Sequence, residues 1–359
     1  MWLRRIEIQG FRNITHAELN PCNGYNLITG ANGSGKSSLL EAIHCLSTGR
    51  SFRTNKKLPI IQNTLQQATL FSEVISNESI YRAGLLKRRD GSSLIKLDGR
   101  SLESQIELAL LLPIIGSTPE TEDMLSEGLK VRQAYLDWTL FHVEPSFREI
   151  WKNYRRVLQQ RNRALKDRFD IATIRSWDNS LVSTGMEVDR LRKVTLTRLV
   201  QGLADTIHLF LPNLKISFSF RQGWPKELSL IDSLTQSFET DRKMGFTHSG
   251  PHRADVVIKS DPGPLTQTLS RGQKKLLTLA LKIAQSLDYK QQTGKSAIMY
   301  VDDLPAELDS INRQLVLQRL LELNLQLFIT ATSPNDVDNN ILQPGKMFHV
   351  EQGRVVNVV

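Results

Sequence analysis

A glycine-rich segment near the N-terminus constrains the fold of this chain more than any other feature. Residues 30–37 read Gly-Ala-Asn-Gly-Ser-Gly-Lys-Ser and match the pattern G-x-x-x-x-G-K-[ST] at every fixed position. An apolar stretch at 25–29 precedes the glycines, and a helical pattern from 36 to about 46 follows them. A strand, a glycine loop and a helix in this order are typical of a phosphate-binding loop. We therefore expect an α/β fold with a nucleotide site at this loop.

The residues of the loop have separate expected roles. Backbone N–H groups converge on phosphate oxygens, and the N-terminus of the following helix adds a favourable dipole. We expect Lys36 to reach the β- and γ-phosphates and Ser37 to hold Mg²⁺ through its hydroxyl. The predicted cofactor-binding residues of the loop are Gly30, Ala31, Asn32, Gly33, Ser34, Gly35, Lys36, Ser37 and Ser38.

A second candidate segment is an apolar strand at 297–301 that ends in two carboxylates, Asp302 and Asp303. Asp302 suits a Mg²⁺ contact through water, and Asp303 suits a base or an orienting group for an attacking water. Taken alone, the pair also fits a strand that ends at a solvated turn. The predicted catalytic residues are therefore Asp303, Lys36 and Asp302, and the predicted metal ligands are Ser37 and Asp302.

Two shorter segments complete the set of motifs. Residues 269–273, Leu-Ser-Arg-Gly-Gln, open a helix, and the Ser270 hydroxyl lies where it can meet an anion. An ordinary helix cap explains the same serine equally well. Residues 306–309, Ala-Glu-Leu-Asp, form a short turn after the carboxylates and indicate little by themselves.

In this order the four motifs resemble the ATP-binding-cassette superfamily. The resemblance implies that two copies of the chain enclose two ATP molecules between them. Ser270 of one copy would touch the γ-phosphate held by Lys36 of the other, and Asp309 would lie across the same interface. It therefore implies ATP and Mg²⁺ as cofactors, an ATP-dependent homodimer, and cofactor-binding roles for Ser270, Gly272, Gln273 and Asp309.

The spacing of the motifs and several local sequences indicate which branch of this superfamily the chain resembles. From Lys36 to Ser270 is 234 residues, by subtraction, and helical patterns fill most of the interval. Such a separation looks like the DNA-repair and chromosome-maintenance branch, in which a helical arm is inserted into the ATPase head. Residues 8–13, 50–53, 132–138 and 250–255 are similar to segments of the RecF family within that branch.

The resemblance to the RecF family covers essentially the whole chain. It implies a mixed α/β ATPase head with an inserted helical arm, divided as residues 1–118 (N-terminal half of the head), 119–240 (arm) and 241–359 (C-terminal half). It adds Arg12 to the cofactor-binding residues. The sequence departs from the family pattern at Arg271, where a small or amide residue is usual, and at 330–332, where a threonine takes the place of a switch histidine.

The implied function is a weak, DNA-dependent ATPase that dimerises on ATP at junctions of duplex and single-stranded DNA. By the same resemblance it would help RecO and RecR load the recombinase RecA. An ATP-gated protein scaffold in which hydrolysis is dispensable is the alternative. A small-molecule kinase is disfavoured by the motifs around Ser270 and Asp309.

The most basic part of the chain is the segment 148–168, where Trp151 and Tyr154 are interleaved with the cations. A helix of this kind neutralises phosphates without reading bases, so we expect contacts to duplex and to gapped or single-stranded DNA. A solvated helix face whose aromatic residues pack inside the arm is the alternative. The predicted DNA contacts are Arg148, Lys152, Arg155, Arg156, Arg161 and Arg163.

Composition adds limits to these expectations. The formal net charge is +9 over 359 residues, which fits a polyanionic partner but also fits a merely basic surface. The two cysteines are too few for a disulfide framework or a zinc site. The N-terminus lacks the apolar core of a signal peptide, and the longest apolar run is too short to span a bilayer, so we expect a cytoplasmic protein without a membrane partner.

Overall fold

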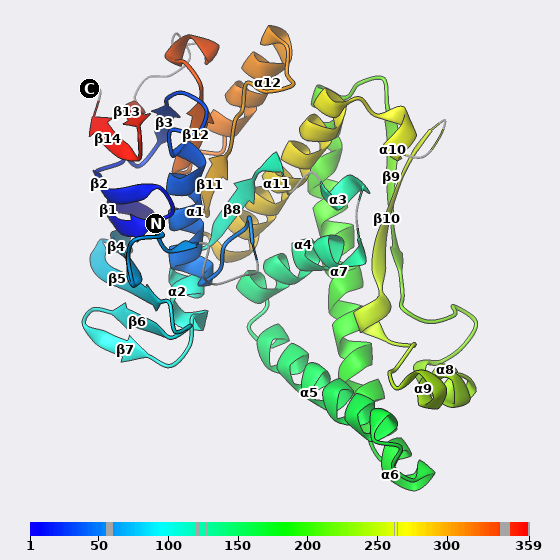
Figure 1. Cartoon of the computed structure of the whole chain (residues 1–359). Coiled ribbons are helices and arrows are strands. Elements are labelled where there is room, and N and C mark those ends of the chain that lie inside the picture. The colour runs from blue at the N-terminus through cyan, green and yellow to red at the C-terminus, as the bar shows by residue number, and fades with distance from the viewer. Residues whose placement is uncertain are drawn as a thin grey trace. The chain divides into compact units, whose positions relative to one another are not determined.

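The computed structural model describes residues 1–54, 60–119, 123–126, 128–261, 263, 265–337 and 345–357. The chain forms two compact units (Figure 1). Unit 1 comprises residues 1–122, 209–211 and 270–359, and unit 2 comprises residues 123–208 and 212–269. Within the described residues, no helix has the length and apolar character needed to cross a membrane.

Unit 1 contains an antiparallel sheet of six strands in the order β2-β1-β4-β5-β6-β7. Alternating burial along β1 and β4 puts one face of this sheet in the core. Its strands are β1 (Trp2–Phe11), β2 (Ile14–Leu19), β4 (Gln67–Ser76), β5 (Ser79–Arg88), β6 (Ser93–Leu97) and β7 (Arg100–Leu102).

The second sheet of unit 1 has the order β14-β13-β3-β12-β11-β8 and is parallel except for its edge strand β14. Strands β3, β11 and β12 are buried along their whole length, as expected for a parallel sheet covered on both faces. Its strands are β3 (Tyr25–Thr29), β8 (Ile114–Ser117), β11 (Ile298–Val301), β12 (Leu327–Ala331), β13 (Gly345–Glu351) and β14 (Arg354–Asn357).

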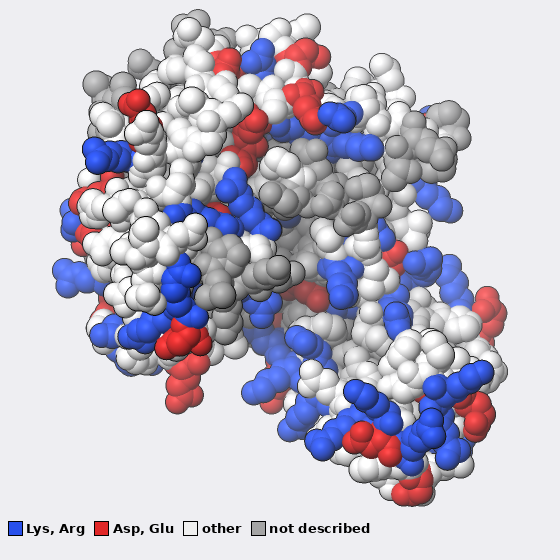
Figure 2. All heavy atoms as spheres, in the orientation of Figure 1, with Lys and Arg blue, Asp and Glu red and all other residues white. Residues whose placement is uncertain are grey.

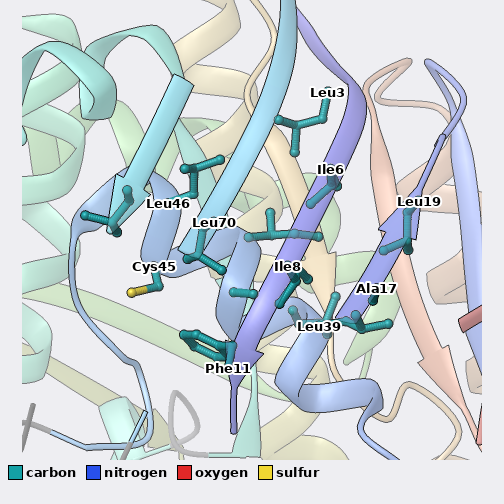
Figure 3. Packing of buried hydrophobic residues seen from close by; sticks show 14 of the residues in the cluster. Leu3, Ile6, Ile8, Phe11, Ala17, Leu19, Leu39, Cys45, Leu46 and Leu70 are labelled. Atoms are coloured by element: carbon teal, nitrogen blue, oxygen red, sulfur yellow. The ribbon is translucent and has the colours of Figure 1, made fainter. Parts of the chain in front are cut away.

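Helix α1 (Lys36–Thr48) shares one hydrophobic core with strands of both sheets. Ten of its thirteen residues are buried, and four of these, Lys36, Ser38, Glu41 and Ser47, are polar or charged. Figure 3 shows Leu39, Cys45 and Leu46 of this helix beside residues of β1, β2 and β4. Among its described residues, unit 1 also contains α2 (Ile106–Leu111), α11 (Arg271–Thr293), α12 (Ser310–Leu321) and the short η4 (Pro334–Asp336).

The order of the parallel strands positions the predicted site. Only β12 separates β3, which leads into the glycine loop, from β11, which leads into Asp302. Because parallel strands end at the same edge of a sheet, the loop and the carboxylate meet there. The mixed α/β architecture predicted from the sequence is confirmed.

Unit 2 is mainly helical and contains one two-stranded ribbon. Its longest helix, α7, spans 33 residues, about 50 Å at 1.5 Å per residue. Its elements are α3 (Asp123–Ser126), α4 (Leu129–Val143), α5 (Phe147–Lys166), α6 (Ile171–Arg175), α7 (Asp178–Phe210), β9 (Lys215–Arg221), α8 (Leu230–Gln236), α9 (Phe238–Met244), η3 (Pro251–Arg253), β10 (Asp255–Asp261) and α10 (Leu265–Thr268).

The structure differs from the expected organisation of unit 2 in two places. Within the segment 119–240, expected to be a helical arm, α7 ends at Phe210 and the strand β9 follows it. The alternation of Ile216, Phe218 and Phe220 with polar residues is typical of a half-buried strand. The unit also runs to residue 269, whereas the predicted arm ends at 240, because β10 pairs along its whole length with β9.

Candidate nucleotide-binding site

The glycine loop holds Lys36 in a fixed position. Lys36 is 7% exposed, and its ammonium donates to the carbonyls of Gly30 at 2.6 Å and Ala31 at 3.0 Å. Burial lowers the pKa of Lys36, and the nearby charges of Asp303 and Asp302 oppose that shift. The cation is therefore enclosed by groups that a phosphate can replace, beside two carboxylates.

Backbone contacts with the C-terminal hairpin support the loop. The Gly353 N–H donates to the Ser34 carbonyl at 2.7 Å. Gly30 has φ 147°, and a Cβ there would lie 2.3 Å from the Val350 carbonyl oxygen. Only glycine therefore fits at the start of the loop, and β13 and β14 belong to the support of the site.

Ser37, Asp302 and Thr330 form one hydrogen-bonded group behind the loop. The Ser37 hydroxyl donates to Asp302 Oδ1 at 3.0 Å, and the Thr330 hydroxyl donates to the same oxygen at 2.7 Å. Thr330 Oγ1 also accepts from the backbone N–H of Asp303 at 2.7 Å. Asp303 itself has φ 51°, a left-handed conformation that aspartate tolerates better than most residues. One threonine thus holds the carboxylate of Asp302 and the backbone of Asp303.

The donor set fits a hard divalent cation. Ser37 and Asp302 supply one hydroxyl and one carboxylate, already within 3.0 Å of each other, and both belong to unit 1. Mg²⁺ prefers oxygen ligands and usually takes few from the protein, with phosphates and water completing the octahedron. Ser37 and Asp302 are therefore suitable Mg²⁺ ligands.

A cavity of about 710 Å³ opens in front of the loop. Its volume is within the range of small-molecule sites. The predicted residues Asn32, Gly33 and Arg12 line it together with the phosphate-binding and carboxylate groups. The full lining is Arg12, Asn13, Asn32, Gly33, Gly35, Lys36, Ser37, Ser38, Arg53, Ile61, Gln62, Asn63, Thr64, Asp302 and Asp303.

Two arginines on the cavity wall share a buried carboxylate. Arg12 donates to Glu41 from Nε at 3.0 Å and from Nη2 at 2.6 Å, and Ser51 Oγ donates to Glu41 at 2.5 Å. Arg53 Nη1 lies 3.9 Å from the same carboxylate, whose side chain is fully buried. Glu41 is on the first turns of α1, so the helix that follows the phosphate loop also holds the cations of the cavity.

Ser270 caps α11 in the manner that its sequence allowed. Its Oγ accepts from the N–H of Gln273 at 3.2 Å, and the Gln273 side chain accepts from the Ser270 N–H at 2.9 Å. Asp309 caps α12 by accepting from Asn312 N at 2.8 Å, and this bond is the main cause of its lowered pKa. Both caps are exposed at the surface, so each remains accessible to a ligand or a second chain.

Gly272 and Lys275 join the two caps into one surface. A Cβ at Gly272 would lie 2.6 Å from the Glu307 carbonyl oxygen, so the start of α11 packs directly on the 306–309 turn. The buried Lys275 ammonium donates to the carbonyls of Asp303 at 2.5 Å and Ala306 at 2.8 Å. Lys275 and Glu41 were not predicted, and neither belongs to a motif that points to it.

The predicted cofactor-binding residues therefore form two groups. The cavity is lined by Arg12, the two carboxylates and six of the predicted loop residues: Asn32, Gly33, Gly35, Lys36, Ser37 and Ser38. The predicted residues Gly30, Ala31 and Ser34 do not line it. In the part of the chain that the structure describes, Ser270, Gly272, Gln273 and Asp309 do not line this cavity but lie on the surface formed by the two helix caps. Within one chain, these four residues therefore do not complete the candidate nucleotide site.

The predicted DNA contacts on α5 also divide into two groups. Lys152, Arg155, Arg156 and Arg163 are exposed, and Figure 2 shows Lys and Arg side chains gathered over this part of unit 2. Arg161 is a correction to the predicted set. Its side chain is fully buried and bonds to Asp178 Oδ1 and Asp241 Oδ2, each at 2.8 Å, so its guanidinium is not available to a phosphate.

Arg148 is intermediate between these groups. It is half-buried, and its guanidinium lies 5.7 Å from the centroid of the Phe141 ring. The interleaved aromatics belong to the core of unit 2, because Phe147 and Tyr154 are buried and Trp151 packs against them. The alternative interpretation of those aromatics as packing residues is therefore the one that the structure supports.

Comparisons with known proteins point to one family over nearly the whole chain. The family model described as the RecF/RecN/SMC N-terminal domain matches residues 2–355. The DNA replication and repair proteins RecF of Shewanella frigidimarina and Shewanella piezotolerans are 43% and 42% identical over 356 residues, covering 99% of this chain and 99% of each relative.

Solved structures are also similar to this chain, and one of them belongs to the same family. A structure described as the recombination mediator protein RecF with ATP, in the RecFOR pathway, is 27% identical and superposes with a TM-score of 0.88, covering 100% of this chain and 98% of that one. An Smc head bound to the C-terminal winged-helix domain of ScpA is 16% identical with a TM-score of 0.59, which indicates a shared fold. The chain is thus similar to one family in sequence and in structure.

Proposed function

Because the chain belongs to the RecF family of DNA replication and repair proteins, we propose that it is an ATP-dependent, DNA-binding recombination mediator. ATP binds in the cavity of unit 1, with its phosphates on the glycine loop. Ser37 and Asp302 hold Mg²⁺, which neutralises negative charge on the phosphates when it is bound. A relative of 27% identity was solved with ATP, which supports this assignment.

The observation that carries the proposal is the separation of the two halves of the site. Lys36 and Asp303 line the cavity, whereas Ser270 and Asp309 are exposed on a different surface of the same unit. A second copy of the chain supplies the missing half, so that Ser270 of the partner contacts the γ-phosphate. ATP then links two protomers, and hydrolysis releases them.

The chemistry proposed for this chain is slow hydrolysis. Asp303 orients or deprotonates the attacking water, and Lys36 stabilises the charge on the transferred phosphoryl group. Thr330 holds the backbone of Asp303 and the carboxylate of Asp302 in place. The exposed cations of α5 bind the phosphates of duplex and gapped DNA without reading sequence. At such junctions the dimer assists RecO and RecR in loading RecA.

Light scattering with and without ATP and duplex DNA tests the central step. For the protein without ATP or DNA, we expect a mass close to that of one chain. When both ATP and DNA are present, we expect the protein part of the complex to have a mass close to that of two chains. Lys36→Ala, which removes the phosphate-binding cation, should remain a monomer under all conditions. A wild-type protein that binds ATP and DNA but never dimerises would contradict the proposal.

The scaffold alternative predicts a different result. Asp303→Asn keeps the size and hydrogen-bonding capacity of the side chain but removes the negative charge used in hydrolysis. If this variant binds ATP and DNA and restores repair fully in cells that lack the wild-type protein, hydrolysis is dispensable and the scaffold interpretation is preferred. Loss of repair with retained binding supports the proposed cycle.

A further inference from the structure

The end of unit 2 exposes apolar side chains that its own core does not use. We call this region the tip and define it as residues 163–175 and 238–244, from the end of α5, α6 and α9 (Figure 1). Phe169 is 48% exposed and Ile171 is 44% exposed. The small core beneath them consists of Ala164, Leu165, Ile174 and Phe238.

The chain presents Phe169 in a fixed way. Arg168 has φ 55°, so the chain turns sharply after α5. The N–H of Arg168 donates to the Leu165 carbonyl, and the N–H of Phe169 donates to the Ala164 carbonyl at 3.0 Å. Directly after Phe169, the Asp170 side chain caps α6 by accepting from Thr173 N at 2.9 Å. Hydrogen bonds on both sides thus hold the backbone that carries an exposed aromatic ring.

The surroundings of the ring are basic. The tip has six exposed cations and three exposed carboxylates, and one carboxylate is engaged as the cap of α6. The cations are Arg163, Lys166, Arg168, Arg175, Arg242 and Lys243, and the carboxylates are Asp167, Asp170 and Glu239. A polyanion therefore matches this surface better than an acidic or neutral partner does.

A row of exposed cations leads along α5 to the tip. Lys152, Arg155, Arg156, Arg163 and Lys166 recur at helical spacings on the face opposite the buried residues Tyr154 and Leu165. From 152 to 166 the row extends about 21 Å at 1.5 Å per residue. This is the axial length of about six base pairs at 3.4 Å each. A phosphate backbone that follows the cations of α5 is therefore led to the end of this helix, three residues before Phe169.

We propose that Phe169 is a stacking platform for an unpaired base at the junction between duplex and single-stranded DNA. Lys152, Arg155, Arg156 and Arg163 of the row on α5 hold the phosphates of the duplex, and Lys166 and Arg168 hold the phosphates of the single strand. Any base can stack on an aromatic ring, so the site selects unpaired DNA without selecting sequence. This inference rests on the proposed DNA-binding function and assigns junction preference to a named residue.

Fluorescence anisotropy of the full-length protein with ATP and Mg²⁺ tests the inference on gapped duplex, fully paired duplex and single strand. Phe169→Ala should weaken binding to the gapped and single-stranded DNA about tenfold, as expected for the loss of one stacked base. Binding to the paired duplex should change less than about twofold, because phosphate contacts on α5 remain. Met186→Ala, which removes an apolar side chain 46% exposed on α7, is the matched control and should change neither.

Two conservative variants identify the type of contact. Phe169→Trp should retain the preference for gapped DNA, whereas Phe169→Leu should lose it. If Phe169→Leu behaves as the wild type, the ring is not a stacking platform and the tip is an apolar docking site for a protein. If Phe169→Ala weakens duplex and gapped DNA equally, the proposed junction role is wrong. Failure of the wild-type protein to bind any DNA would instead overturn the proposed function itself.

Discussion

The carboxylate of Glu41 and the guanidinium of Arg12 form a two-point ion pair on the wall of the nucleotide cavity, with N–O distances of 3.0 Å and 2.6 Å. Glu41 is fully buried, and Arg12 has φ 56°, which is unusual for a long side chain. The pair connects the turn after β1 to the helix that follows the phosphate loop. It therefore couples the position of Arg12 to the loop itself.

Glu41→Gln should reduce ATP affinity about tenfold and stability by about 1–3 kcal/mol, because the partly buried Arg12 loses its charged partner. Titration with a fluorescent ATP analogue and urea unfolding measure the two effects. Glu18→Gln removes an exposed carboxylate that pairs with Arg5 and serves as the control. Equal affinities for Glu41→Gln and the wild type would show that Arg12 does not depend on this carboxylate.

Thr330→Val should separate hydrolysis from binding. The variant keeps the shape of the buried side chain but leaves the Asp303 N–H without its acceptor and the Asp302 carboxylate with one donor fewer. We expect ATP hydrolysis to fall about tenfold because the Asp302 carboxylate and the backbone of Asp303 lose their fixed positions, with ATP affinity changed by less than about twofold. Steady-state phosphate release measures the loss, and Thr330→Ser should restore most of it. An unchanged rate in Thr330→Val contradicts the orienting role.

Gly272→Ala should abolish the ATP-linked dimer without removing the nucleotide. The added methyl group would lie 2.6 Å from the Glu307 carbonyl, so the caps of α11 and α12 must move apart. Gly202→Ala on α7 meets no atom within 4 Å and should stabilise its helix by about 1 kcal/mol, which makes it a matched control. Light scattering and ATP titration report the two properties, and a normal dimer of Gly272→Ala would contradict this assignment of the surface.

Two neighbouring arginines of α5 should have opposite phenotypes. Arg161→Leu leaves Asp178 and Asp241 buried without their cation, so we expect a loss of about 3–5 kcal/mol in the stability of unit 2. Arg163→Ala removes a side chain that is 83% exposed and should preserve stability while weakening DNA binding and lowering its salt dependence. Thermal unfolding and anisotropy at two salt concentrations distinguish them. The reverse pattern would place the DNA surface on the other face of the helix.

The stability of unit 2 should decrease below neutral pH because of His252. Its Nε2–H donates to the Thr247 carbonyl at 3.0 Å, and its Nδ1 accepts from the Tyr154 hydroxyl at 2.6 Å, which is the neutral form. Burial lowers the pKa of His252 to about 4, whereas an unfolded histidine titrates near 6.5. The unfolded chain therefore gains a proton that the folded chain excludes, and stability falls as the pH drops from about 6.5 towards 4.

At pH 5.5 this histidine alone should cost about 1 kcal/mol relative to pH 7.5. Urea unfolding at the two pH values measures the difference. His252→Gln removes the titrating group and should show a smaller pH dependence, although its stability at pH 7.5 is lower. Burial also lowers the pKa of His142 to about 3, so part of the dependence should persist. An identical pH dependence in the variant would exclude His252 as its source.

The sequence by itself determined the local chemistry of the site. A strand, the glycine loop and helix α1 are contiguous, so their geometry follows from short-range backbone preferences and from the fixed positions of Gly30, Lys36 and Ser37. The caps at Ser270 and Asp309 are equally local, because each bonds to a residue three positions later. The order of these motifs was enough to predict the fold class.

Only the tertiary structure decided which of these groups meet. Thr330 reaches Asp302 across 28 positions of the chain, because β11 and β12 are neighbours. Arg161 and Arg163 are alike in sequence, but Arg161 turns to the side of α5 that packs in unit 2 and finds Asp241 80 positions away. Partners this distant are set by the packing of whole elements, which residue type and local spacing do not specify. For that reason the basic residues of segment 148–168 were enough to predict a basic helix. The packing of α5 in unit 2 then determined which of its cations are exposed.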